Sequence, residues 1–76
     1  MLKDIIEFTV KSLVEFPQSV VITENQQDSK SIFEIRVSEQ DIGKVIGKEG
    51  QTIRALRMLL IALAPAGKEI EVTVAK

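Results

Sequence analysis

The sequence predicts a two-layer α+β fold, in which helices pack on one face of a three-stranded sheet. Two observations indicate this class. Apolar residues recur at helical spacing at the start of the chain and again after its middle, and three other segments have the alternation or β-branched content of strands. With 76 residues, of which 45% are hydrophobic, the chain is expected to form one domain over residues 1–76.

The first element is expected to be an amphipathic helix over residues 2–16. Its apolar stripe has helical spacing, while charged side chains occupy the other side. The stripe consists of Leu2, Ile5, Ile6, Thr9, Leu13 and Phe16. Pro17 should end the helix, because the residue before a proline is pushed out of the helical region. We expect this helix to cover the sheet.

The three strands are expected at residues 19–24, 31–37 and 68–76. The first is rich in β-branched residues, and the polar segment 25–30 that follows it is predicted to be the turn of a hairpin. The second strand alternates, with Phe33, Ile35 and Val37 on one face. The third strand alternates in the same way, so each should bury one face and expose the other.

Two helices joined by a short turn are predicted between the second and third strands. Ser38 and Asp41 have the spacing of a capping box and should open a helix over residues 39–46. Glycines interrupt the pattern at residues 47–50, and the second helix is expected over residues 51–64. The complete element order is therefore α-β-β-α-α-β.

The composition excludes several classes of function. Histidine, cysteine, tryptophan and tyrosine are absent, so the commonest general base and the soft metal ligands are missing. The acidic residues form no convincing cluster. We therefore expect no enzyme, no metal, no cofactor and no small-molecule substrate. No apolar stretch approaches the roughly 20 residues that cross a bilayer, so no membrane span is expected.

Basic residues gather around the glycine turn. Residues 43–57 contain Lys44, Lys48, Arg54 and Arg57 against Glu49 alone, a local charge of +3, whereas residues 1–42 carry −4. A window of this length can reach such a charge by chance, and the position of the cluster at the turn is what makes it informative.

The turn itself reads Gly47-Lys48-Glu49-Gly50, and its glycine spacing matches neither a P-loop nor a dinucleotide-binding fingerprint. A tight connection between two helices needs one residue at positive φ, which explains one glycine but not both. Two glycines around an exposed charged pair would let the backbone of a ligand approach closely. Free amides near Gln51 and Thr52, at the start of the next helix, would then favour an anion.

The stretch VIGKEGQTIRAL resembles the signature of the KH domain, with Ile46 before the GxxG and with Ile53 and Leu56 after it. The predicted element order is that of the type II KH fold, so the resemblance covers the whole chain. KH domains bind about four nucleotides of single-stranded RNA or DNA, and the GxxG clamps their backbone. The resemblance therefore implies a cytoplasmic, bacterial RNA-binding or RNA-chaperone protein.

The resemblance also assigns residues to this site. The clamp is Gly47, Lys48, Glu49 and Gly50. The residues expected around it are Ile42, Gly43, Lys44, Ile46, Thr52, Ile53, Arg54 and, from the second strand, Arg36, with Ile35 as a weaker candidate. Core packing is the alternative role for Ile46, Ile53 and Leu56, because buried aliphatic residues usually pack. A solvated strand position is the alternative for Arg36.

Two features predict weak RNA binding with low sequence selectivity. Glu49 would place a carboxylate near a phosphate, and no aromatic side chain lies near the groove to stack on a base. With roughly three phosphates neutralised, log affinity should fall against log salt concentration with a slope of about −2. The same two features favour an alternative function, a KH-shaped protein-interaction module whose partner carries the RNA-binding activity.

The helix over residues 51–64 has more apolar surface than a single sheet can cover. Met58, Ile61 and Ala62 lie off the stripe that would face the sheet. Either the N-terminal helix covers them, or they form a self-complementary interface in a homodimer. The KH resemblance implies self-association or pairing with the KH protein KhpB (also called Jag).

Overall fold

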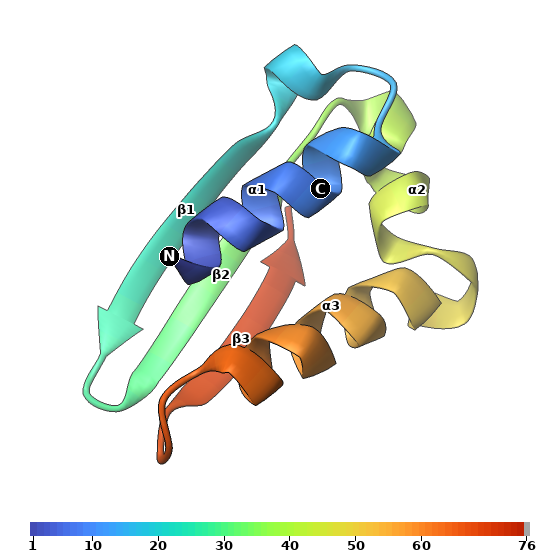
Figure 1. The fold of residues 1–76 in the computed structure, drawn as a ribbon. Coiled ribbons are helices and arrows are strands. Elements are labelled where there is room, and N and C mark those ends of the chain that lie inside the picture. The colour runs from blue at the N-terminus through green and yellow to red at the C-terminus, as the bar shows by residue number, and fades with distance from the viewer. Residues whose placement is uncertain (76) are drawn as a thin grey trace.

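Three helices and a three-stranded sheet form two layers in the computed structural model, which describes residues 1–75 (Figure 1). The elements in chain order are α1 (Leu2–Leu13), β1 (Val21–Gln27), β2 (Lys30–Arg36), α2 (Ile42–Ile46), α3 (Gln51–Leu63) and β3 (Glu69–Val74). Both long helices, α1 and α3, lie across the same face of the sheet. The predicted α+β class and the order α-β-β-α-α-β are thus confirmed.

The central strand of the sheet is β2, which pairs antiparallel with β1 and parallel with β3. Its residues Phe33 and Ile35 are fully buried beneath the helices, as the alternation predicts, and they pair with Val72 and Val74 of β3. The buried core consists of Ile6, Val10, Val20, Ile22, Phe33, Ile35, Val45, Leu56, Leu60 and Ile70. The opposite face of the sheet carries mainly polar and charged side chains, with Val21 and Ile32 among them.

The hairpin of β1 and β2 is longer and its turn tighter than the sequence predicts. Pairing continues through Asn25 opposite Ile32 to Gln27 opposite Lys30, so the turn is reduced to Asp28 and Ser29. Asp28 has a φ of 53°, a conformation that aspartate tolerates better than most residues. The polar residues extend the strand because their side chains are exposed there, and the backbone bonds to β2 decide their conformation.

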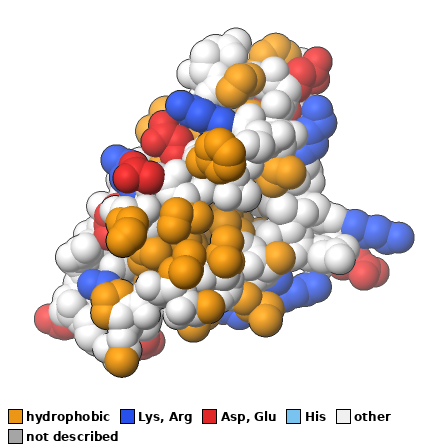
Figure 2. Space-filling view, in the orientation of Figure 1, with side chains coloured by type: hydrophobic (Ala, Val, Ile, Leu, Met, Phe, Trp, Pro, Cys, Tyr) orange, Lys and Arg blue, Asp and Glu red, His pale blue; other side chains and the backbone are white. Residues whose placement is uncertain are grey.

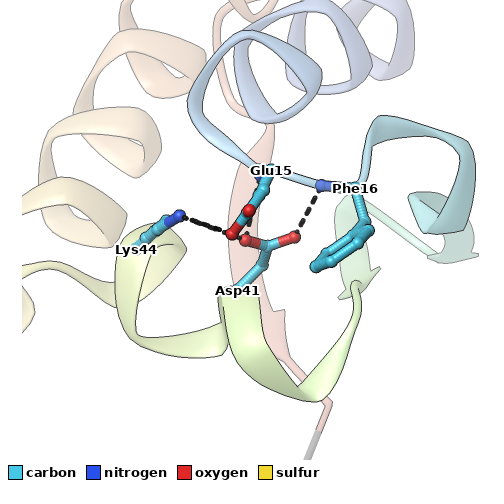
Figure 3. Close-up of polar contacts among 4 residues, drawn as sticks. All are labelled: Glu15, Phe16, Asp41 and Lys44. Carbon is cyan, nitrogen blue, oxygen red and sulfur yellow. Dashed lines mark hydrogen bonds and ion pairs between the residues drawn. The ribbon is translucent and has the colours of Figure 1, made fainter.

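The first helix ends at Leu13, earlier than the predicted residue 16. Val14 is extended, and the backbone amides of the next two residues, Glu15 and Phe16, donate hydrogen bonds to the carboxylate of Asp41 (Figure 3). An acceptor that is distant in sequence thus replaces the helical carbonyls. The predicted stripe also changes, because Val10 is in the core and Leu13 is 43% exposed.

The helix predicted over residues 39–46 is a 3₁₀ turn (Glu39–Asp41) followed by α2. The expected capping box is wrong. The Ser38 side chain makes no capping bond, and the Asp41 carboxylate is turned into the protein toward the end of α1. The reason is again a tertiary contact, since Asp41 is fully buried.

Candidate nucleic-acid interface

The turn between α2 and α3 has an unusual backbone. Gly47, Glu49 and Gly50 all have positive φ, of 78°, 56° and 74°. A Cβ atom on Gly47 would lie 2.8 Å from both the Cβ and the backbone nitrogen of Thr52, so the first turn of α3 leaves no room for a side chain there. A Cβ on Gly50 would meet only Arg54 Nη1 at 3.7 Å, so its φ alone favours glycine at that position. Both glycines therefore have a local structural cause.

Hydrogen bonds within the turn leave two amides available. The Gly47 amide donates to the Gly43 carbonyl at 2.8 Å, the Gly50 amide donates to the Gly47 carbonyl at 3.1 Å, and the Gln51 amide donates to the Lys48 carbonyl. The expectation from sequence that the Gln51 amide is free is therefore wrong. Within residues 1–75, the amides of Lys48 and Glu49 donate to no protein acceptor, and both residues are exposed. These two N–H groups are available to a ligand.

The charges around the turn differ in how they are held. Arg54 Nη1 donates to the Glu49 carbonyl oxygen at 3.0 Å, so this guanidinium braces the turn. Among residues 1–75, no ion pair involves Lys48 or Arg57. Lys44 lies 3.6 Å from the carboxylates of both Glu15 and Asp41, which offset its charge (Figure 3). The uncompensated positive charge is therefore on the side of α3.

A groove of about 250 Å³ runs between α3 and β3, beside the turn. It is lined by Ile53, Arg54, Arg57 and Val72. Ile53 and Arg54 were expected at the site from sequence, and Arg57 was expected beside the turn as part of its basic cluster. Val72 was not expected there, although one signal was present, since it is an inward position of an alternating strand.

The predicted residues on α2 and α3 differ in how far they are buried. Ile42 and Ile46 are half-buried but do not belong to the core or to the side chains packed against it. Gly43 is exposed, and a Cβ built on it would meet nothing within 4 Å. Leu56 by contrast is a core residue, and Ile53 packs against the core while also lining the groove.

The strand candidates do not join the site. Ile35 is fully buried in the core, so its expected role as a groove wall is wrong. Arg36 follows it on the opposite face of the sheet, away from the helices, and pairs with Glu34 at 3.4 Å. The alternation that predicted the buried face of β2 thus also keeps both residues away from the groove.

A second, apolar surface covers the outer side of α3. Met58 and Ile61 are 66% and 49% exposed, and Leu59, Ala62 and Leu63 are exposed as well. α1 does not cover them. A groove of about 270 Å³ remains between the helices, lined by Thr9, Val10, Leu13, Val45, Thr52, Ala55, Leu56 and Leu59. Figure 2 shows hydrophobic side chains gathered on this face.

Metal sites and membrane-spanning helices were also considered over residues 1–75. Residues 1–75 contain no group of acidic side chains arranged to hold a metal ion. Over the same residues, no helix is both long and apolar enough to cross a bilayer.

Comparison with known proteins bears on this geometry. The KH-domain family described as KhpA/KhpB matches residues 3–75. The RNA-binding protein KhpA of Thermotoga maritima is 40% identical over 75 residues, covering 99% of this chain and 100% of that protein. The RNA-binding protein KhpA of Chlamydia caviae is 46% identical over 63 residues, covering 83% and 81%. That of Aquifex aeolicus is 45% identical over 62 residues, covering 82% and 78%.

Among solved structures, the chain resembles part of the protein Era in a crystal structure with MgGDPNP and nucleotides 1506–1542 of 16S ribosomal RNA. The TM-score is 0.59 at 24% sequence identity, over 97% of this chain and 30% of the Era chain, which supports the fold alone. The three KhpA relatives are named RNA-binding proteins, in agreement with the expectation of no enzyme. On the family match and on the identity to these relatives, the chain is a member of the KhpA/KhpB family of KH domains.

Proposed function

We propose that this protein binds single-stranded RNA, with the backbone of the strand held at the GxxG turn and the bases lying along the groove between α3 and β3. The observation that carries the proposal is the pair of free amides at Lys48 and Glu49. They lie beside a groove that is lined by two aliphatic side chains and two arginines, of which Arg57 makes no ion pair within residues 1–75. The curated relatives are named RNA-binding proteins, which supports the same function.

Each part of the site has a physical role in this proposal. The amides of Lys48 and Glu49 donate to phosphate oxygens, and the Lys48 ammonium adds a mobile positive charge. Arg57 and Arg54 line the groove with Ile53, so a base meets an apolar wall with guanidinium groups at its border. The bare face of α2 at Gly43, between Ile42 and Ile46, lets the sugar–phosphate chain approach the helix.

Binding is proposed to be weak and low in sequence selectivity. The exposed Glu49 carboxylate lies within the turn, and the side chains that line the groove include no aromatic ring. Stacking on an aromatic side chain would contribute about 1–3 kcal/mol per base, and this contribution is missing. We expect the protein to act in the cytoplasm as an RNA-binding protein or RNA chaperone.

The test is a fluorescence anisotropy titration with a labelled single-stranded RNA of mixed sequence. Gly50→Asp places a carboxylate at the turn, where two like charges about 4 Å apart in water repel by about 1 kcal/mol, so affinity should fall about fivefold. Gly47→Asp is less suitable, because its side chain would collide with Thr52 and disturb the start of α3.

Gly67→Asp is the matched control. Gly67 has a similar positive φ, of 84°, with nothing within 4 Å of its Cβ, and it lies in the loop before β3, away from the turn. Both variants add one negative charge and similar backbone strain. Only Gly50→Asp should weaken RNA binding. Equal affinity of the two variants would remove the turn from the interface and favour the alternative, a protein-interaction module whose partner binds RNA.

We further propose that the protein self-associates through the outer side of α3. The exposed Met58, Ile61 and Ala62, joined by Leu59, offer the apolar surface that a two-fold contact needs. Pairing with KhpB through the same surface is the corresponding heterodimer, which the shared family name suggests. A dimer would give a weak binding module a second contact with the same strand and so raise its avidity.

Sedimentation equilibrium tests the interface. Ile61→Asp should shift the mass from dimer to monomer, whereas Phe8→Asp should leave it unchanged. Phe8 is the matched control because it is an apolar residue, 76% exposed, on the other helix. A monomeric parent, or equal dissociation of both variants, would contradict this interface.

A further inference from the structure

The structure contains one buried ionisable group that the RNA site does not use. Asp41 is fully buried, and its two carboxylate oxygens each accept a hydrogen bond from a backbone amide. Oδ1 accepts from Glu15 at 3.0 Å and Oδ2 accepts from Phe16 at 3.0 Å (Figure 3). These amides are in the segment directly after α1, so a single side chain joins the end of α1 to the start of α2.

The carboxylate is held as an anion. Burial acts to raise the pKa of Asp41, but the hydrogen bonds from the Glu15 and Phe16 amides and the charge of Lys44 outweigh it, so the pKa lies below its ordinary value. Lys44 Nζ is 3.6 Å from Asp41 Oδ1 and 3.6 Å from Glu15 Oε1. Both hydrogen bonds to the Asp41 carboxylate come from neutral backbone amides, and the Lys44 ammonium acts on it from a longer distance.

The segment that Asp41 anchors leads directly to the GxxG turn. α2 has only five residues, Ile42–Ile46, which is too short for a helix to be stable by itself. Its one buried side chain is Val45. Asp41, which directly precedes α2, is the other buried residue of this segment. The orientation of α2, and with it the direction in which the turn presents its free amides, depends on these two residues.

We propose that Asp41 is a positioning residue for the nucleic-acid interface, which fixes α2 and the GxxG turn by bonding to the amides that follow α1. The inference depends on the proposed RNA-binding function only in the experiment that measures RNA affinity. Asp41 itself does not touch the RNA.

The test compares Asp41→Asn with Lys44→Gln. An asparagine of the same shape can accept only one of the two amide hydrogen bonds and directs an N–H₂ group at the other amide. Lys44→Gln removes the ammonium but leaves both amide bonds in place. Each variant is measured at a temperature at which circular dichroism shows it to be folded.

The first readout is amide hydrogen exchange. In Asp41→Asn, the amides of Gly47 and Gly50, which are hydrogen-bonded in the turn, should exchange faster, while those of the hairpin of β1 and β2 should keep their protection. Lys44→Gln should leave both sets unchanged. A uniform loss of protection across the protein, or no change at the turn, would overturn the proposal and leave Asp41 with a general structural role.

The second readout is affinity for the labelled single-stranded RNA. Asp41→Asn should weaken binding about threefold to tenfold, the range expected for a single hydrogen bond, with an unchanged salt dependence because no phosphate contact is removed. If the parent binds no RNA, the proposed function fails while hydrogen exchange still decides the role of Asp41.

A measurement on the parent protein covers the case in which Asp41→Asn does not fold. In an NMR titration toward low pH, the amide shifts of Gly47 and Gly50 should move with the same midpoint as the Asp41 carboxyl. Turn amides that do not follow the Asp41 carboxyl would contradict the positioning role.

Discussion

Replacing Gly43 with alanine should make the protein more stable and its RNA binding weaker. The residue lies in the first turn of α2 without a positive φ, and a Cβ atom there would meet nothing within 4 Å. The folded protein therefore has no structural need for this glycine. Alanine in a helix is favoured over glycine by about 0.5–1 kcal/mol, and the lower value applies near a helix start.

The expected gain in stability is large enough to be measured by thermal unfolding. For a domain of this length, about 0.5 kcal/mol corresponds to a rise in melting temperature of about 2–4 °C. The new methyl group would occupy the space through which the sugar–phosphate chain approaches α2, so affinity in the anisotropy titration should fall several-fold. Stability and binding would thus change in opposite directions, which a general loss of structure cannot produce.

Gly67→Ala is the control for this prediction. Gly67 has a φ of 84°, so alanine there should lower the melting temperature while leaving RNA affinity unchanged. The reasoning would be refuted if Gly43→Ala bound RNA as tightly as the parent, because the open face of α2 would then not belong to the interface.

Three further outcomes are expected. RNA affinity of the parent should fall against salt with a log–log slope of about −2, and Lys48→Gln should reduce the slope by about one; a slope near zero would exclude phosphate contacts. Leu60→Ala, in the core, should cost about 2–5 kcal/mol in urea unfolding, whereas Phe8→Ala, 76% exposed, should change stability by less than about 0.5 kcal/mol. The pKa of Asp41 lies below its ordinary value of 3.8, so its contribution to stability should be full above that value and lost as pH falls through the lowered pKa. Urea unfolding at a series of pH values would show this loss in the parent and a flatter acid limb in Asp41→Asn.

Periodicity predicted the architecture because the buried faces are consistent along each element. Phe33 and Ile35 alternate with charged residues in β2, and Leu56 and Leu60 repeat at helical spacing in α3. The boundaries were less predictable. α1 ends where the amides of Glu15 and Phe16 find the Asp41 carboxylate, a partner that is 26 and 25 residues away in sequence.

The candidate site was predictable in part for the same reason. The GxxG turn is a local pattern, although the sequence predicts one residue at positive φ and the structure has three, Gly47, Glu49 and Gly50. The groove is not local, since it forms only where α3 lies beside β3, and this is why Val72 was not assigned to it. The spacing of Asp41 from Ser38 predicts a capping box, and nothing local in the sequence indicates that the Asp41 carboxylate instead bonds to the end of α1.

The parallel pairing of β2 with β3 has a consequence for the order of folding. The hairpin of β1 and β2 is local and can form early, but β3 reaches its place beside β2 only after the chain has passed through α2, the turn and α3. The groove proposed to hold RNA uses β3 as one wall. During synthesis, a chain that has not yet released β3 from the ribosome lacks this wall, so the proposed RNA-binding site is completed only with the last strand.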